Sequence, residues 1–214
     1  MTASPRSPSY WVEATQALAA CDPVLASLIE HHRPFVLGSR GDAFQTLARA
    51  IVGQQISVKA AQSVWNRLVE CVETVEPHTV MVARVEELRA AGLSQRKAEY
   101  VRDLACRFHE GSIAVTDWPR MDDEAIIEQL TAVRGIGRWT AEMYLIFNLA
   151  RPDVLPLADL GLQRALSIHY NRSRPLSRRK LGMVTRPWTP WRSVATWYMW
   201  RSLEPASGAA GGRP

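Results

Sequence analysis

The stretch Leu130-Thr-Ala-Val-Arg-Gly-Ile-Gly-Arg-Trp-Thr-Ala-Glu-Met-Tyr-Leu145 places two glycines, Gly135 and Gly137, between two apolar-periodic segments. This pattern predicts that one helix ends at the glycines and another begins at once, because glycine permits a turn too tight for side chains. The first N–H groups of the second helix have no intrahelical partner and carry its positive dipole end, so we expect them to bind a phosphate group. An alternative interpretation is that the turn only joins two packed helices.

Spacings of three and four between apolar residues recur along the whole chain, and no alternating β-branched run is long enough to propose a sheet. We therefore predict an all-α fold. Helices are expected at Val12–Ala20, Pro23–His31, Phe44–Val52, Ser57–Cys71, Val82–Ala91, Ser94–Phe108, Asp123–Val133, Trp139–Ala150, Leu160–Tyr170 and Pro190–Ser202. Asp122 suits the N-cap of the helix before the hairpin, and Thr189 followed by Pro190 suits the start of the last helix.

The predicted organisation is a single helical domain over residues 11–204, with the hairpin at about 123–150. Residues 1–10 and the Gly-, Ala-, Ser- and Pro-rich segment 205–214 are expected to be mobile. The start of the chain has no apolar segment typical of a secretion signal, and no window is long enough to span a membrane. We therefore expect a soluble cytoplasmic protein.

The amino-acid composition limits the class of protein further. Of the 214 residues, 47% are hydrophobic, and 26 Lys and Arg against 21 Asp and Glu give a formal net charge of +5. This excess is compatible with a polyanionic partner but does not require one. The three cysteines show no CxxC spacing, so a disulfide framework, a four-thiolate metal site and an iron–sulfur cluster are all excluded.

Asp159 is an acidic residue in the otherwise apolar segment Leu155–Leu162, at the expected start of a helix. One interpretation is a helix N-cap, and the other is a catalytic carboxylate. Both roles can coexist, because helix N–H groups keep a carboxylate ionised and oriented. The segment from Pro190 to Trp200 concentrates aromatic residues on one helix, for which a core stripe is the alternative to a binding surface.

Five segments, in this order, resemble the helix-hairpin-helix DNA glycosylase superfamily, and specifically its 3-methyladenine DNA glycosylase II branch. The resemblance runs from roughly Phe44 to Arg201 and is carried by Ala50–Ser57, Ala91–Ala98, the Gly-Ile-Gly-Arg-Trp-Thr-Ala hairpin, Leu155–Leu162 and Pro190–Ser193. It implies two helical lobes with the active-site cleft between them. It also implies that the protein flips alkylated purines such as 3-methyladenine and 7-methylguanine out of double-stranded DNA and hydrolyses their N-glycosidic bonds, leaving an abasic site.

The resemblance also implies roles for individual residues. Asp159 takes the place of the catalytic carboxylate, and the aromatic lesion pocket is expected to comprise Trp139, Trp200, Tyr144 and Trp197. DNA contacts are expected from Gly135, Ile136, Gly137, Arg138, Thr140, Arg134, Gln54, Gln55 and Ser57. Gln55 stands where relatives insert a wedge into the gap left by the flipped nucleotide, whereas Ser57 has helix capping as an alternative role. No cofactor is required, although the carbonyl oxygens of Thr131, Val133 and Ile136 match positions that hold Na⁺ or K⁺ when DNA is bound.

One substitution bears on the type of reaction. Superfamily members that also cut the DNA backbone resemble this hairpin but carry a lysine where Trp139 stands. An indole cannot form a Schiff base, so we expect base excision without lyase activity. Arg134 replaces the proline often found before the first hairpin glycine, and it either adds a cation near DNA or is an ordinary solvated arginine.

Basic residues near these motifs are further candidates for phosphate contacts, with a solvated surface as the alternative for each. They are Arg134, Arg138, Lys59, Arg96, Lys97 and Arg192. The run Arg172–Lys180 is expected to be a basic loop that either touches DNA or is only flexible.

Two other functions stay open on the sequence alone. A non-catalytic helix-hairpin-helix DNA-binding module would not need Asp159 or the aromatic residues. A glycosylase of the same fold that acts on neutral lesions or mismatches would differ only in its preferred base. In the favoured interpretation the partner is double-stranded DNA containing alkylated bases, and the protein is a monomer associated with the nucleoid.

Overall fold

The computed structural model describes residues 8–32 and 42–204, so the expected mobility of residues 1–7 and 205–214 lies outside the described residues. Within them, the hydroxyl of Tyr10 donates to the carbonyl oxygen of Ala150 at 2.6 Å, and its ring stacks on Trp191 with centroids 5.6 Å apart. Burial raises the pKa of Tyr10 to about 12. Tyr10 thus contacts residues far along the chain, and the mobility expected of residues 1–10 stays a prediction.

Every regular element in the two described ranges is helical, which confirms the all-α prediction. The chain divides into two compact units. Among the described residues, unit 1 holds 8–32 and 149–204, and unit 2 holds 42–148. None of the helices in these ranges is both long enough and apolar enough to cross a membrane.

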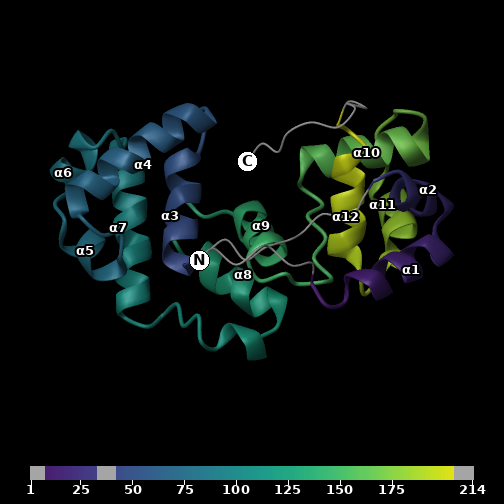
Figure 1. Ribbon diagram of the computed structural model, residues 1–214, viewed down its shortest axis with the longest axis horizontal. Helices are drawn as coiled ribbons and strands as arrows, with labels where there is room; N and C mark the ends of the chain where they lie inside the picture. The colour runs from purple at the N-terminus through teal and green to yellow at the C-terminus, as the bar shows by residue number, and fades with distance from the viewer. Residues whose placement is uncertain (1–7, 33–41, 205–214) are drawn as a thin grey trace. The chain divides into compact units, whose positions relative to one another are not determined.

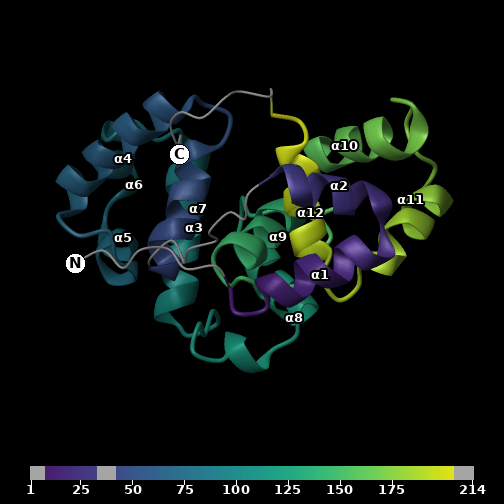
Figure 2. The same cartoon turned by 45° about the vertical axis from the view of Figure 1, so that its right-hand side comes forward.

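Unit 1 joins the two ends of the described chain. Its elements are α1 (Trp11–Cys21), α2 (Pro23–His31), α10 (Leu160–Asn171), α11 (Arg178–Thr185), the 3-10 helix η2 (Arg186–Trp188) and α12 (Arg192–Arg201). Helix α12 packs against α1, α2 and α10 (Figure 2). Leu18, Leu25, Leu166 and Val194 are fully buried, which places the core of this unit around α12.

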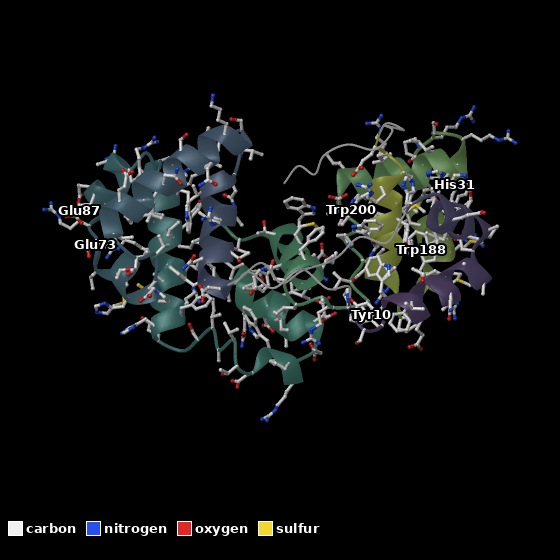
Figure 3. The ribbon with its side chains drawn as sticks, viewed as in Figure 1. Tyr10, His31, Glu73, Glu87, Trp188 and Trp200 are labelled. Carbon is white, nitrogen blue, oxygen red and sulfur yellow. The ribbon has the colours of Figure 1, made fainter. Side chains whose placement is uncertain are left out.

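Asp22 is a buried carboxylate at the centre of unit 1. It N-caps α2 by accepting from the backbone N–H groups of Val24 at 2.9 Å and Leu25 at 3.2 Å. Its other oxygen accepts from the Tyr170 hydroxyl at 2.8 Å and from Trp188 Nε1 at 3.0 Å; Figure 3 labels Trp188. Burial, together with this acceptor, raises the pKa of Tyr170. One side chain thus joins α2 to α10 and η2.

We expect Asp22→Ala to lower the free energy of unfolding by about 3–5 kcal/mol, because it removes the cap and leaves two buried donors without an acceptor. Chemical denaturation followed by circular dichroism measures the loss. Asp42→Ala is the matched control, because Asp42 caps α3 by a single exposed bond to the N–H of Gln45 at 2.9 Å. That variant loses only about 1 kcal/mol. Equal losses in the two variants would contradict the assigned role of Asp22.

Unit 2 is a bundle followed by the predicted hairpin. Its elements are α3 (Ala43–Gly53), α4 (Val58–Val72), α5 (Pro77–Val82), α6 (Val85–Ala90), α7 (Gln95–His109), the 3-10 helix η1 (Trp118–Arg120), α8 (Asp123–Thr131) and α9 (Arg138–Phe147). Helix α3 packs against α4 and α7, and α8 packs against α9 (Figure 1). The buried side chains of Phe44, Leu47, Ile51, Val101 and Leu104 form the core between α3 and α7.

Several predicted boundaries are wrong. The helix expected at Val82–Ala91 is shorter, since α6 spans Val85–Ala90 and begins where the N–H of Arg84 donates to Glu87 Oε2 at 2.9 Å. Helix α5 (Pro77–Val82), which ends before the extended residue Ala83, was not predicted. Helix α9 ends at Phe147 rather than Ala150, whose φ is +50°. The expected N-cap at Asp122 is confirmed, since its carboxylate accepts from the N–H of Ala125 at 2.7 Å.

The last helix begins two residues later than predicted, so Thr189 and Pro190 are not its cap and first residue. Segment 152–153 takes the place of a local cap. The N–H of Ser193 donates to the carbonyl oxygen of Pro152 at 3.0 Å, and the N–H of Arg192 donates to Asp153 Oδ1 at 3.3 Å. A partner forty residues away in the sequence therefore decides where α12 starts.

Candidate functional site

The hairpin between α8 and α9 packs closely against α7 because Gly135 has no side chain. The turn is closed by the N–H of Ile136, which donates to the carbonyl oxygen of Val133 at 3.1 Å, and both side chains are buried. Gly135 has φ +87°, and a Cβ added there would lie 2.1 Å from Cδ2 of Tyr100 on α7. Both the backbone angle and the close approach therefore require glycine. Sequence reasoning did not identify Tyr100 as the residue against which the turn packs.

Helix α9 begins without a side-chain cap. Gly137 is its N-cap residue, and the N–H of Ala141 is the first to bond back, to the carbonyl oxygen of Gly137 at 3.1 Å. By contrast, a Ser or Asp side chain caps seven other helices in the described part of the chain: α2, α3, α4, α7, α8, α10 and α11. The uncapped start leaves N–H groups at residues 138–140 able to bind an anion.

The loop after α3 is bonded to the hairpin. Gln54 Nε2 donates to the carbonyl oxygen of Gly135 at 2.8 Å. Lys97 Nζ donates to the carbonyl oxygens of Val52 at 2.8 Å and Gln54 at 2.7 Å, and burial lowers the pKa of this lysine. The prediction that Lys97 approaches a phosphate is therefore wrong, because its ammonium group caps the end of α3. Its role could not be read from the sequence, since the bonded carbonyl groups lie more than forty residues away.

Gln55 projects from this loop in an unusual backbone conformation. Its φ is +58°, in the left-handed region, and the residue is exposed. Ile56 and Val58 beside it are 40% and 72% exposed, so the loop presents apolar side chains to solvent. The alternative role for Ser57 is confirmed, because its Oγ accepts from the N–H of Ala60 at 3.2 Å and caps α4.

Two hairpin arginines already bind carboxylates. Arg134 pairs with Glu99 at 3.0 Å and lies over the Tyr100 ring, 5.7 Å from its centroid. Arg138 bonds to Glu124 at 2.9 Å and to Glu142 at 3.0 Å. The hydrogen bonds to Glu124 raise the pKa of Arg138. These carboxylates offset the positive charge that the sequence suggested for the hairpin, which leaves its backbone N–H groups as the stronger candidates for an anion.

The remaining predicted phosphate contacts divide into two kinds. Arg192 is paired in two places with Asp153, at 2.7 and 2.9 Å, so it orders the start of α12. Sequence reasoning missed Asp153 as its partner. Lys59 and Arg96 are exposed, as a phosphate contact requires.

Asp159 N-caps α10 and is held by two donors in unit 1. Its Oδ1 accepts from the N–H of Leu162 at 2.6 Å and from Nε1 of Trp200 at 2.8 Å. Trp200, labelled in Figure 3, comes from the last part of α12. The carboxylate is half-buried, and the neighbouring side chains of Leu157 and Leu160 are exposed. The two bonds keep the carboxylate oriented in a residue that is only half-buried.

Gly161 makes the contact between Asp159 and Trp200 possible. A Cβ at this position would lie 3.1 Å from Asp159 Oδ1 and 3.2 Å from Cδ1 of Trp200. Sequence reasoning did not single out this glycine. A glycine two residues after a candidate catalytic acid, at the start of a helix, is the pattern that could have indicated it.

The four aromatic residues assigned to a lesion pocket differ in exposure. Trp139 is 49% exposed and Trp200 is partly exposed, so both can meet a ligand. Tyr144 is only 5% exposed and packs edge-on against Trp118, and Trp197 is 4% exposed and packs edge-on against Trp11 and Tyr198. Tyr144 and Trp197 are therefore buried among other aromatic rings, and their assignment to the lesion pocket stays a prediction.

A surface hollow of about 510 Å³ lies on α8 and the start of α9, lined by Asp122, Glu124, Ala125, Ile127, Glu128, Thr131 and Arg138. Its three carboxylates, those of Asp122, Glu124 and Glu128, make it unsuitable for a phosphate. In the described ranges no three His, Cys, Asp or Glu side chains are grouped so as to hold a metal ion. The expected cation site uses the backbone carbonyls of Thr131, Val133 and Ile136 instead, and it stays a prediction.

Comparisons with known proteins place these features in context. Residues 48–183 match the family described as "HhH-GPD superfamily base excision DNA repair protein". A putative DNA-3-methyladenine glycosylase of Bacillus subtilis is 31% identical over 84% of this chain, and the match spans 66% of that relative's length.

Solved structures show the same similarity over most of both chains. A DNA-3-methyladenine glycosidase of Bacillus halodurans superposes with a TM-score of 0.82 at 34% identity, covering 88% of each chain. The 3-methyladenine DNA glycosylase Mag1 of Schizosaccharomyces pombe, solved in complex with abasic DNA, superposes with a TM-score of 0.74 at 29% identity. That match covers 91% of this chain and 98% of the fission yeast chain.

Proposed function

The chain belongs to the HhH-GPD superfamily of base excision DNA repair proteins, as its motifs predicted, and on this premise we propose that it is a monofunctional DNA glycosylase for alkylated purines. The protein binds damaged duplex DNA, flips the base out and hydrolyses the N-glycosidic bond, leaving an abasic site. The observation that carries this proposal is the half-buried carboxylate of Asp159, oriented by the N–H of Leu162 and by Trp200 Nε1.

Asp159 supplies the charge that the reaction needs. Alkylation at N3 or N7 makes a purine cationic and therefore a good leaving group, so positive charge develops on the deoxyribose as the bond breaks. A carboxylate about 4 Å from that charge, at an effective dielectric of about 20, stabilises the transition state by on the order of 4 kcal/mol. The same group can accept a proton from the attacking water. Because the two bonds orient the carboxylate before substrate binds, little reorganisation opposes the reaction.

Exposed indoles favour a cationic base over a neutral one. Trp139 and Trp200 present ring surface at the start of α9 and the end of α12, respectively. Each indole can favour binding of a cationic base over a neutral base by about 0.5–2 kcal/mol through cation–π attraction. Modest selectivity over several alkylated purines follows. The indole of Trp139 cannot form a Schiff base, which is why the proposal excludes lyase activity.

Unit 2 supplies the DNA contacts. The uncapped N–H groups at 138–140 bind one phosphate, and Gln55, held in its left-handed conformation on the loop bonded to Gly135, enters the gap left by the flipped nucleotide. The monovalent cation at the hairpin carbonyls belongs to the same proposal. We further propose that the protein acts on DNA as a monomer, which gel filtration with light scattering tests.

The experiment incubates the protein with duplex DNA methylated by dimethyl sulfate and identifies the released bases by chromatography. Release of 3-methyladenine and 7-methylguanine with intact DNA strands supports the proposal. Binding without release would favour a DNA-binding module, and release of only neutral bases such as hypoxanthine would favour a glycosylase for neutral lesions. Strand cleavage with a borohydride-trapped adduct would overturn the exclusion of lyase activity.

We expect Trp200→Phe to lower the single-turnover rate of base release by about tenfold, because it removes the N–H that orients Asp159 but keeps an aromatic ring. Trp188→Phe is the matched control, since it also removes an indole N–H from a carboxylate, that of Asp22. We expect Trp188→Phe to have a lower melting temperature than the wild type. At temperatures where this variant is folded, its rate of base release should equal that of the wild type. Equal rate losses in both variants would show that the effect of Trp200 is one of stability.

A further inference from the structure

Positive charge is concentrated in one segment of unit 1. Residues 160–203 contain nine Lys and Arg residues and no Asp or Glu, whereas in the rest of the chain acidic residues outnumber basic ones by 21 to 17. The net charge of +5 therefore comes entirely from this segment. Its middle part, Arg172, Arg174, Arg178, Arg179 and Lys180, is called here the α11 basic surface.

The α11 basic surface is an ordered structure rather than a flexible loop. Ser177 caps α11 by accepting from the N–H of Lys180 at 3.3 Å, so the second half of the run expected to be a loop is helical. Asn171 Nδ2 donates to the carbonyl oxygens of Arg174 at 2.9 Å and Pro175 at 2.8 Å. The Oδ1 atom of Asn171 accepts from Lys180 Nζ at 2.6 Å. One amide thus joins the end of α10, the connecting turn and α11.

The arginines of this surface differ from others in the same segment. Arg192 is paired with Asp153 and Arg201 with Glu204. The side chains of Arg172, Arg174, Arg178 and Arg179 are exposed, and no ion pair found among residues 8–32 and 42–204 involves them. Residues 172–180 hold five cations and no carboxylate, so an external anion would stabilise them.

A chain of regularly spaced phosphates fits such a surface. Helix α11 has 8 residues and is therefore about 12 Å long, and each strand of a duplex places one phosphate per ~3.4 Å of the duplex axis. We propose that the α11 basic surface is a second phosphate-binding surface, which contacts the DNA backbone independently of the α8–α9 hairpin. This inference rests on the proposed function, because that function makes duplex DNA the polyanion that the protein meets.

The test measures the salt dependence of DNA binding. Fluorescence anisotropy gives the dissociation constant for an undamaged duplex at several KCl concentrations, for the wild type and for Arg178→Gln/Arg179→Gln. Lys180 is left in place because Asn171 uses it. The matched control, Arg84→Gln/Arg89→Gln, removes two exposed cations from α6 and its N-cap, so the net charge changes equally.

If Arg178→Gln/Arg179→Gln loses two phosphate contacts, its plot of log association constant against log salt concentration becomes less steep, with a slope smaller in magnitude by about 1.8. The affinity advantage of the wild type over Arg178→Gln/Arg179→Gln then shrinks by about tenfold between 50 and 200 mM KCl. The control keeps the wild-type slope. Equal slopes for Arg178→Gln/Arg179→Gln and the control would overturn the inference. It would also be overturned if Arg178→Gln/Arg179→Gln kept the wild-type slope on DNA but lost binding to phosphatidylserine vesicles.

A parallel measurement separates this inference from the proposed function. The same wild-type preparation is tested for release of 7-methylguanine. If 7-methylguanine is released and the two variants have equal slopes, only the inference of a second phosphate-binding surface is overturned. No release together with a reduced slope would overturn the glycosylase activity and support the surface as a DNA contact.

Discussion

Asp159→Asn is expected to lower the rate of 7-methylguanine release by about a thousandfold, because the neutral amide cannot stabilise the positive charge that develops on the deoxyribose. The fold should not change. The asparagine Oδ1 can still accept from the N–H of Leu162 and from Trp200 Nε1, so the cap of α10 and the contact with α12 persist. Single-turnover kinetics with excess enzyme on methylated duplex measures the chemical step directly.

Asp42→Asn is the matched control for this variant, since it makes the same chemical change at another helix N-cap, that of α3. Its rate of base release and its melting temperature should match those of the wild type. DNA affinity, measured on an abasic duplex, should be retained in both variants. A rate loss below about tenfold in Asp159→Asn would mean that the carboxylate is mainly a helix cap, and the catalytic proposal would then be abandoned.

Gly135→Ala is expected to destabilise the protein by about 2–4 kcal/mol and to weaken DNA binding at the same time. An added Cβ would lie 2.1 Å from the Tyr100 ring, and φ +87° is unfavourable for any residue with a side chain. The turn must therefore shift, which moves the N–H groups at the start of α9 and breaks the 2.8 Å bond from Gln54. Thermal denaturation should show a melting temperature lower by roughly 5–15 °C.

Gly182→Ala is the stability control for the hairpin variant, because a Cβ at this helical position would meet no heavy atom within 4 Å. It should raise the free energy of unfolding by about 0.5–1 kcal/mol. A Gly135→Ala protein that melts like the wild type would contradict the close packing of the turn on α7. One that is destabilised but binds DNA normally would contradict the assignment of a phosphate to the hairpin.

Local chemistry made much of this molecule predictable from its sequence. Most of the helices, the Gly-Ile-Gly turn and the caps at Asp122 and Asp159 depend on residues within a few positions of one another, and the structure confirms them. The short helices α5 and α11 were not predicted. Trp200 could be placed beside Asp159 only through the resemblance of the motifs, since forty-one residues separate them.

The failed predictions concern partners that are distant in the sequence. Lys97 and Arg192 look like free cations, yet they bind groups 39–45 residues away. The sequence also could not indicate that packing buries Tyr144 and Trp197 while Trp139 stays exposed. The run Arg172–Lys180 has the composition of a loop, and the amide of Asn171 together with the cap at Ser177 gives it a defined structure.

The sequence by itself determined the all-α class, the family and the position of the candidate catalytic acid, because helix periodicity, turn glycines and capping act over a few residues. Only the tertiary structure decided which aromatic rings and which cations are accessible. Burial and ion pairing depend on which surfaces meet when helices pack, and residue type and spacing leave that choice open.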